Sequence, residues 1–189
     1  MLRSGLRPFT TKCLRRNIYD EMFTTKEGAA ITSIRTVHPD DLPALKKIID
    51  ETELFPSELL DDMMARYFAG EDDSQWLTYD NGNPVAVAYV TPEPMTSGTW
   101  NALLLAVHPK VQGQGFGTAL MRHIEGMLTE RGARVLLVET SGLGAFKPTR
   151  QFYGKIGYKK EACIRDFYDA GDDKIVFRKA LGASSQQEK

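Results

Sequence analysis

A glycine-rich turn is the feature of this sequence best suited to chemistry. An apolar run ends at Val107, and the turn Gln112-Gly113-Gln114-Gly115-Phe116-Gly117 follows and leads directly into a helical pattern. The first N–H groups of a helix have no acceptor within the helix, and the helix dipole favours negative charge there. Glycines carry no Cβ atom, so a phosphate can approach the backbone closely. The turn is therefore predicted to bind a phosphate group.

Two common phosphate-binding motifs do not fit this turn. A Walker P-loop requires Lys after its last glycine, but Gly117 is followed by Thr118. The dinucleotide motif G-x-G-x-x-G requires a glycine where Thr118 or Leu120 stands. The pattern that remains is Q-x-x-G-x-G on Gln112, Gly115 and Gly117. A connection without any ligand is the alternative, although three glycines at one helix start exceed what a turn alone needs.

This pattern resembles the pyrophosphate-binding signature of the GCN5-related N-acetyltransferases, the GNAT superfamily. The resemblance implies that acetyl-coenzyme A (acetyl-CoA) is the cosubstrate and that no metal is used. It also implies that the strand ending at Val107 supplies backbone groups to the pantetheine and to the thioester carbonyl. The residues implied to bind the coenzyme are Leu105, Ala106, Val107, Gln112, Gly113, Gln114, Gly115, Phe116, Gly117 and Thr118.

A second segment carries the same resemblance. Within residues 148–162, the pattern F-Y-x-K-x-G-Y matches the superfamily's short late helix and places a tyrosine at position 153. The resemblance implies that Tyr153 lies beside the coenzyme A sulfur and protonates the leaving thiolate. The pKa of a phenol, about 10, lies near that of an alkyl thiol, so this proton transfer would be close to balanced. A half-buried aromatic side chain on an amphipathic helix is the alternative for Tyr153.

The sequence departs from the superfamily pattern near this helix. Many relatives carry an Asn that helps to hold the pantetheine, and Phe146 stands at that position here. Arg150 has two interpretations, a contact with a coenzyme A phosphate or a position on a solvated helix face.

Glu139 is the candidate general base, because it follows the apolar strand Val135–Val138 at the end where α/β sheets gather ligands. It could take the proton of an acceptor amine, bind a cationic acceptor, or be a solvated strand end. Asp166 and Tyr168 are further candidates for acceptor contacts. His108 is a weaker candidate base, and His123 is predicted to be packed rather than catalytic.

The remaining pattern predicts an alternation of strands and helices. Strands are predicted at 31–37, 75–79, 84–90, 99–107, 134–139, 158–167 and 174–179, and helices at 39–52, 56–69, 115–131 and 148–156. This order matches that of the GNAT fold. The fold class is therefore expected to be α/β, with a mixed sheet of six to seven strands and about four helices. The sheet is expected to splay between the strands that end near Val107 and Glu139.

Composition limits the class of protein. The chain has 189 residues, 42% hydrophobic and 26% charged, with a net charge of −1, which suits one globular domain and gives no general attraction to nucleic acid. No apolar run has the length of a membrane span. Residues 31–182 are expected to form the acetyltransferase domain, residues 1–30 a basic extension and residues 183–189 a disordered tail.

The expected compartment is the cytoplasm. Residues 1–19 contain five Lys or Arg and no acid, a composition typical of a mitochondrial transit peptide, so the mitochondrial matrix is the alternative. Translation starting at Met22 would remove this segment.

The acceptor is expected to be a small molecule or amino-acid-like primary amine. Eleven acidic residues within 40–73 favour a cationic acceptor through electrostatic steering, although they could equally form a solvated face. An acetyltransferase of protein N-termini or lysines is the second hypothesis and would require an open groove. A non-catalytic acyl-CoA sensor is the third. A homodimer is expected only by analogy with the superfamily.

Overall fold

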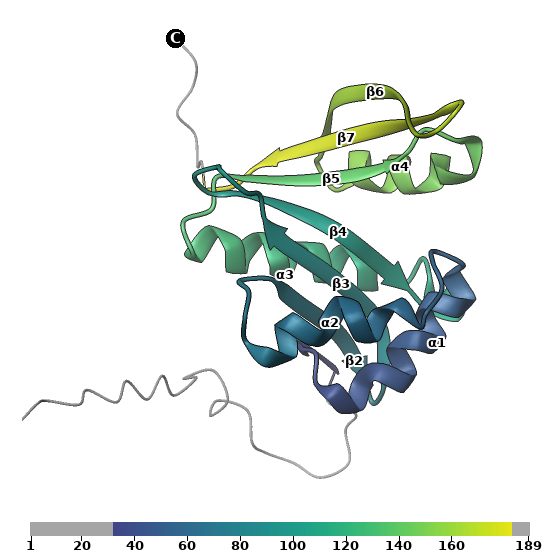
Figure 1. Cartoon of the computed structure of the whole chain (residues 1–189), viewed down its shortest axis with the longest axis vertical. Coiled ribbons are helices and arrows are strands. Elements are labelled where there is room, and N and C mark those ends of the chain that lie inside the picture. Colours follow the sequence, from purple (N-terminus) through teal and green to yellow (C-terminus); the bar gives the residue numbers. More distant parts are fainter. Residues whose placement is uncertain (1–31, 183–189) are drawn as a thin grey trace, which may run out of the picture.

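The computed structural model describes residues 32–182, which form one seven-stranded sheet and four α-helices (Figure 1). The strand order in the sheet is β1-β2-β3-β4-β5-β7-β6. The strands are β1 (Thr32–Thr36), β2 (Gln75–Asn81), β3 (Pro84–Pro92), β4 (Thr99–Val107), β5 (Val135–Ser141), β6 (Lys159–Asp169) and β7 (Asp172–Ala180). The helices are α1 (Leu42–Thr52), α2 (Leu59–Ala69), α3 (Phe116–Glu130) and α4 (Lys147–Lys155). The predicted α/β class, element order and strand number are confirmed.

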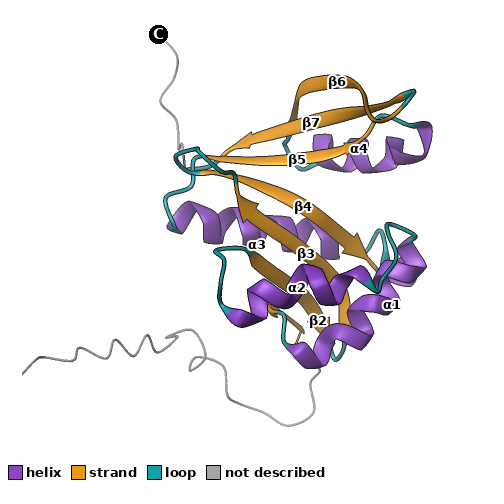
Figure 2. Cartoon of the chain, in the orientation of Figure 1, coloured by secondary structure: helices purple, strands orange, loops and turns teal. Residues whose placement is uncertain are grey.

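The two halves of the sheet are covered differently (Figure 2). One core lies between α1, α2 and one face of β2–β4, and it includes Leu45, Met64, Trp76 and Leu104. The other core lies on the opposite face, where α3 and α4 pack against the sheet from β2 to β7. The half formed by β5, β7 and β6 therefore has helices on one face only, and its other face is open.

The sheet splays between its two central strands. β4 and β5 form a parallel pair whose register runs from Thr99 opposite Val135 to Ala102 opposite Val138. Beyond this point β4 continues to Val107 without pairing to β5, while β5 pairs with β7 as far as Ser141. A register shift between β3 and β4 leaves Leu103 without a partner on β3. This shift lies at the place where β4 separates from β5. Backbone groups of β4 are thereby left available beside the gap, as predicted.

Several boundaries differ from the prediction. Pro56 and Ser57 form a turn, and α2 begins only at Leu59. His123 is exposed on α3, so the prediction that it is packed was wrong. Neighbouring residues of a helix point in different directions, so a difference of one position separates the apolar stripe from the solvent-facing side.

The basic extension (1–30), Met22 and the tail (183–189) lie outside the described residues. In the part of the chain from 32 to 182, no helix is long and apolar enough to cross a membrane.

Candidate active site

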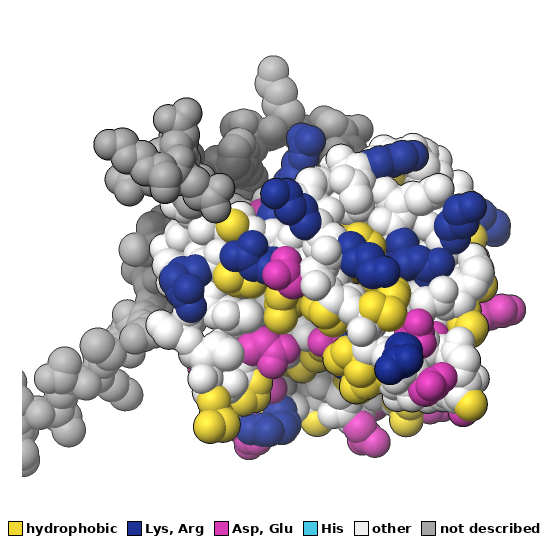
Figure 3. Space-filling model, turned by 90° about the horizontal axis from the view of Figure 1, so that it is seen from above, with side chains coloured by type: hydrophobic (Ala, Val, Ile, Leu, Met, Phe, Trp, Pro, Cys, Tyr) yellow, Lys and Arg dark blue, Asp and Glu magenta, His cyan; other side chains and the backbone are white. Residues whose placement is uncertain are grey.

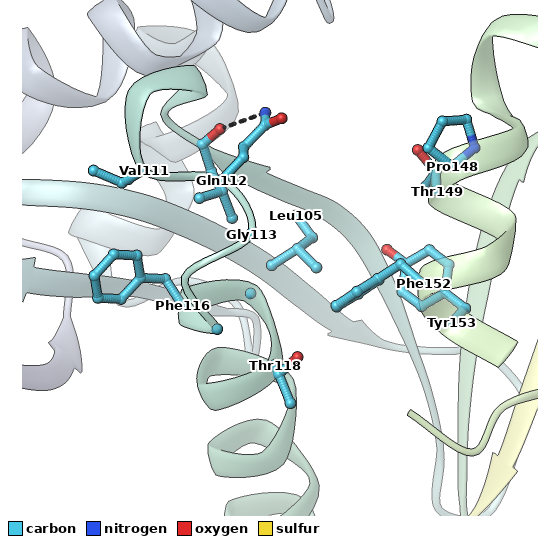
Figure 4. Close-up of a pocket in the computed structure, with 13 residues that line it drawn as sticks. Leu105, Val111, Gln112, Gly113, Phe116, Thr118, Pro148, Thr149, Phe152 and Tyr153 are labelled. Atoms are coloured by element: carbon cyan, nitrogen blue, oxygen red, sulfur yellow. Dashed lines mark hydrogen bonds between the residues drawn. The ribbon is translucent and has the colours of Figure 1, made fainter. Parts of the chain in front are cut away.

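A cavity of about 530 Å³ lies at the splay, on the face that carries α3 and α4. Its walls come from three segments: the end of β4, the turn that opens α3, and the first turns of α4. In Figure 4 the turn and α4 lie on opposite sides of the cavity, with Leu105 of β4 between them. The lining residues are Leu105, Val107, Val111, Gln112, Gly113, Gly115, Phe116, Gly117, Thr118, Pro148, Thr149, Phe152 and Tyr153. Three segments predicted separately from the sequence therefore meet at one cavity.

The turn presents unpaired backbone donors to this cavity. The first hydrogen bond at the start of α3 runs from the Ala119 N–H to the Gly115 carbonyl, at 2.9 Å. Among the described residues, the N–H groups of Phe116, Gly117 and Thr118 have no backbone acceptor, as expected for the first turn of a helix. Donors of this kind, at the positive end of the helix dipole, suit a phosphate group.

Two glycines of this turn differ in what they contribute. Gly115 adopts φ 93°, ψ −4°, a left-handed conformation that other residues rarely adopt. Gly117 has no such constraint, but a Cβ there would lie 3.4 Å from Val107 Cγ2 and 3.6 Å from Phe152 Cζ. The first glycine allows the chain to turn. At the second, a Cβ would only touch β4 and α4, so a side chain larger than a methyl group is what would be obstructed.

The side chain of Gln112 holds the turn against the strand. Its Nε2 donates a hydrogen bond to the Val107 carbonyl at 3.0 Å, shown as the dashed line in Figure 4. The sequence predicted Gln112 as a coenzyme ligand, and the structure adds this second contact, which fixes the distance between the end of β4 and the glycines. Gln114 does not line the cavity, and the Ala106 side chain is buried on the opposite face of β4. The side chain of Ala106 therefore cannot contact a ligand in this cavity.

Tyr153 lies in the wall of the cavity that α4 provides (Figure 4). Its ring is 5% exposed and packs against the rings of Phe152, Tyr158 and Phe177, with centroids 5.1–5.9 Å apart. Burial raises the pKa of Tyr153, so the phenol keeps its proton throughout the neutral range. Proton transfer from Tyr153 to a thiolate is therefore less balanced than transfer from a free phenol, whose pKa is lower.

Arg150 makes contacts that neither of its two interpretations included. Its guanidinium Nη1 donates hydrogen bonds to the Ser141 carbonyl at 2.6 Å and to the Leu143 carbonyl at 2.9 Å. Arg150 therefore fastens α4 to the loop that follows β5. Phe146, at the position where relatives carry Asn, is half-buried at the start of α4.

Glu139 lies on the open face of the sheet, immediately after the last paired position of β5 with β4. Leu136 and Val138 are buried toward α3, so the alternation of side chains places Glu139 on the opposite face. Its Oε2 lies 2.7 Å from Lys174 Nζ in an ion pair, and the two side chains are 24% and 12% exposed. Among the described residues, Glu139 Oε1 has no hydrogen-bond partner. The candidate base is thus half of an ion pair.

Two aromatic rings complete this group on the open face. Lys174 Nζ lies 3.5 Å from the ring centroid of Phe167 and 5.9 Å from that of Tyr168. The pKa of Tyr168 is raised by partial burial and by the negative charges of Glu139 and Asp172. The structure therefore places the predicted residues Glu139 and Tyr168 close together.

A wide bulge in β6 carries the rings to this position. The register passes from Ile164 opposite Lys174 to Asp169 opposite Asp172, leaving residues 165–168 opposite Asp173 alone. Asp166 adopts φ 52°, its N–H donates to Asp173 Oδ1 at 3.1 Å, and its own carboxylate accepts from the Gly171 N–H at 2.8 Å. The Asp166 side chain thus closes the bulge, and its predicted contact with an acceptor stays a prediction.

The contacts of His108 connect parts of the fold. Its Nε2 lies 3.1 Å from Glu51 Oε2 of α1, and its Nδ1 accepts from the Lys110 N–H. It ties the end of β4 to the first helix.

No group of three or more His, Cys, Asp or Glu side chains between residues 32 and 182 could hold a metal ion.

Sequence reasoning missed several residues at both places. Val111, Pro148, Thr149 and Phe152 line the cavity, Lys174 pairs with Glu139, and Phe167 lies beside Lys174. Phe152 stood in the matched late-helix motif and could have been named from it. Lys174 had no such signal, because its partner is 35 positions away and the contact depends on the pairing of β5 with β7.

Comparisons with known proteins agree with this architecture. A family profile described as "Acetyltransferase (GNAT) domain" matches residues 71–160. The [ribosomal protein bS18]-alanine N-acetyltransferase of Escherichia coli K12 is 26% identical over an alignment of 152 residues. The alignment covers 77% of this chain and 95% of that protein. The profile match includes the glycine turn and the helix that bears Tyr153.

Solved structures share the whole fold. The crystal structure of an acetyltransferase of the GNAT family from Desulfovibrio desulfuricans aligns with a TM-score of 0.73 and 29% identity, covering 79% of this chain and 98% of that one. The ribosomal-protein-S18-alanine N-acetyltransferase structure from Escherichia coli aligns with a TM-score of 0.61 and 22% identity, covering 84% and 99%. The cavity, the splay and the glycine turn thus occur in the fold of an acetyltransferase.

The chain belongs to the GNAT superfamily and is an N-acetyltransferase. Enzymes of this superfamily use acetyl-CoA as the acetyl donor, and the unpaired donors of the turn fit its pyrophosphate.

Proposed function

We propose that this enzyme transfers the acetyl group of acetyl-CoA to the α-amine at the N-terminus of a protein or peptide. Of the acceptors expected from the sequence, the relatives favour this second hypothesis over a small-molecule amine. The named relative in Escherichia coli acts on an alanine of ribosomal protein bS18.

The openness of the acceptor side is the observation that carries the proposal. A protein terminus needs a groove that a chain can enter, whereas a small amine can be enclosed. Every residue of the edge strand β6 is exposed, and Leu103 at the splay is 51% exposed. Viewed from the end of the molecule that carries β6 and β7, hydrophobic side chains reach the surface between charged side chains of both signs (Figure 3). Such a surface suits a peptide better than a small polycation.

Charge on the neighbouring helices supports a basic acceptor. α1, α2 and the turn between them carry Asp50, Glu51, Glu53, Glu58, Asp61 and Asp62. Two of these carboxylates have partners, since Lys46 lies 2.5 Å from Asp61 and His108 lies 3.1 Å from Glu51. The others would attract a basic segment that follows the acceptor's first residues.

The coenzyme is assigned to the cavity on the opposite face. The N–H groups of the turn would hold the pyrophosphate, and the unpaired edge of β4 from Leu105 to Val107 would hold the pantetheine and the thioester carbonyl. One backbone donor aimed at a developing oxyanion contributes about 10²–10³ in rate. In this proposal the acceptor amine would approach from the side of Glu139, where β4 and β5 no longer pair, and the two substrates would meet in a ternary complex.

The proposed chemistry uses one residue from each face. The acceptor nitrogen forms a bond to the acetyl carbon, and the bond from that carbon to the sulfur breaks. Glu139 takes the proton of the amine, directly or through water, and Tyr153 gives a proton to the sulfur. A thioester is already activated, so positioning of the two reactants supplies much of the remaining acceleration.

Initial rates with matched peptides test this function. One peptide has a free N-terminal alanine, the second has the same sequence with a blocked terminus and one lysine, and polyamines and amino sugars form the third class. We expect acceptor-dependent thiol release with the first peptide, and mass spectrometry should locate the acetyl group on its α-nitrogen. Turnover confined to the small amines would overturn the proposal. Binding of acetyl-CoA without turnover on any acceptor would instead indicate a sensor.

A further inference from the structure

We propose that Lys174 is a positioning residue that orients Glu139 and makes the site select an α-amine over a lysine ε-amine. This inference rests on the proposed function, because it assigns the acceptor amine to the open face beside Glu139. It concerns a residue outside the glycine turn and outside the helix of Tyr153.

The geometry gives Lys174 a defined orientation. Its ammonium group is held between Glu139 Oε2, at 2.7 Å, and the face of the Phe167 ring, at 3.5 Å from the centroid. The side chain is only 12% exposed, and the bulge at 165–168 that positions Phe167 is closed by the carboxylates of Asp166 and Asp173. A cation between a carboxylate and an aromatic face is favoured by both neighbours.

This contact determines how Glu139 meets an acceptor. Lys174 Nζ lies closest to Oε2, and no described group donates a hydrogen bond to Oε1, so Oε1 is the oxygen left for the amine. Without Lys174 the carboxylate could rotate about its χ angles and hydrate, because no other described side chain holds it. The proton-accepting atom would then no longer be fixed beside the splay.

The pair also determines the charge of the site. A lone carboxylate attracts any ammonium group, and it would bind the charged form of the acceptor, which cannot attack a thioester. The Glu139–Lys174 pair carries no net charge, so it gives no such advantage to the protonated acceptor. An acceptor that loses its proton readily is therefore favoured.

This difference separates the two kinds of protein amine. Reference pKa values are about 7.7–8.0 for an α-amine and about 10.4 for a lysine ε-amine. At neutral pH the neutral fraction of the α-amine is therefore larger by a factor of about 300. A site with no net charge preserves this ratio, whereas an unpaired carboxylate would reduce it by retaining lysine ammonium groups.

The test compares kcat and KM of the full chain on the two matched peptides, with free alanine terminus and with blocked terminus plus lysine. For Lys174→Met we expect kcat on the α-amine peptide to fall about tenfold, and the ratio of kcat/KM between the two peptides to fall about tenfold, with a lower KM for the lysine peptide. Lys174→Arg keeps the cation and should restore both quantities to within about threefold of the wild type.

Lys179→Met is the matched control. Lys179 forms a similarly buried pair with Glu125, at 2.7 Å, on the face that carries α3. It should lower thermal stability to a comparable extent without changing the ratio between the peptides. Circular dichroism melts on all variants separate loss of fold from loss of selectivity.

Two results would overturn the inference. One is an unchanged ratio in Lys174→Met. The other is a Lys174→Arg variant that behaves like Lys174→Met, which would indicate a packing role for this one side chain. Neither result affects the proposed function, which fails only if the wild-type enzyme leaves free N-termini unmodified.

Discussion

The two faces of the splay are built in different ways. On the side proposed to bind the coenzyme, one contiguous stretch from the end of β4 to the start of α3 lines the cavity, with the first turns of α4 opposite, and its glycine turn presents backbone N–H groups. On the acceptor side, Glu139, Lys174, Phe167 and Tyr168 come from β5, β7 and a bulge in β6, and they interact through side chains. A phosphate can be bound by any chain that presents N–H groups correctly. An acceptor must be distinguished from others, and that requires particular side chains.

The difference predicts how each side responds to substitution. Changes on the coenzyme side should affect affinity for acetyl-CoA, whatever the acceptor. Changes on the acceptor side should leave that affinity unchanged and alter turnover or acceptor choice. Tyr153 stands on the proposed coenzyme side but is proposed to act in the chemical step, so it provides the sharpest test of this division.

Tyr153→Phe should produce the largest effect. It removes the proposed proton donor and keeps the ring among Phe152, Tyr158 and Phe177. We expect kcat to fall about 10²–10³-fold and the Kd of acetyl-CoA to stay within about twofold. Stopped-flow turnover and calorimetric binding measure the two quantities. Tyr158→Phe is the control, because its hydroxyl bonds Glu125 Oε1 at 3.0 Å, away from the cavity; a comparable loss in that variant would contradict a specific role for Tyr153.

Glu139→Gln should rank second and decide the role of this residue. If Glu139 is the base, kcat falls about 10²-fold and KM for the peptide changes little. If it only binds a cationic acceptor, KM rises and kcat is kept. An unchanged kcat/KM would remove Glu139 from the mechanism altogether.

Gly117→Val should act on the coenzyme alone. The added side chain would meet Val107 and Phe152 and extend into the cavity. We expect the Kd of acetyl-CoA to rise at least about tenfold, a loss of about 1.4 kcal/mol in binding. Gly126→Val places the same change at an exposed position of the same helix with nothing within 4 Å. Equal effects at both positions would show that the helix, rather than the cavity, is sensitive.

Asp41→Asn should affect neither face and should change stability. Asp41 accepts two hydrogen bonds from Arg35, at 2.7 and 2.8 Å, and this guanidinium holds the pKa of the carboxyl below its usual range. The lowered pKa means that the stabilisation is present above the unfolded pKa of about 3.9 and is lost as the pH falls through the folded value. Urea unfolding should show a deficit of about 2 kcal/mol in the variant at pH 7. The deficit should shrink below about pH 4, and a deficit that stays constant down to pH 2 would contradict this account.

The same comparison explains what could be predicted from the sequence. Strand and helix order followed from periodicity, and the predicted limits of β4 agree with the structure, because turn residues mark both ends. Helix α2 was predicted to start too early, because Pro56 and Ser57 resemble a helix start but form a turn. Arg150 could not be assigned, because its acceptors are carbonyls of a loop whose position depends on the docking of α4.

The sequence alone determined the coenzyme side. Gln112, Gly115 and Gly117 are close in the chain, and the chemistry of a helix start with glycines is local, so spacing was sufficient to predict a phosphate site. Only the tertiary structure decided the acceptor side. Glu139 and Lys174 meet because β7 lies between β5 and β6, and Phe167 reaches Lys174 because β6 bulges opposite Asp173. Contacts that depend on strand pairing over tens of residues leave no periodic signal in one sequence, because register is fixed by the packing of the whole sheet.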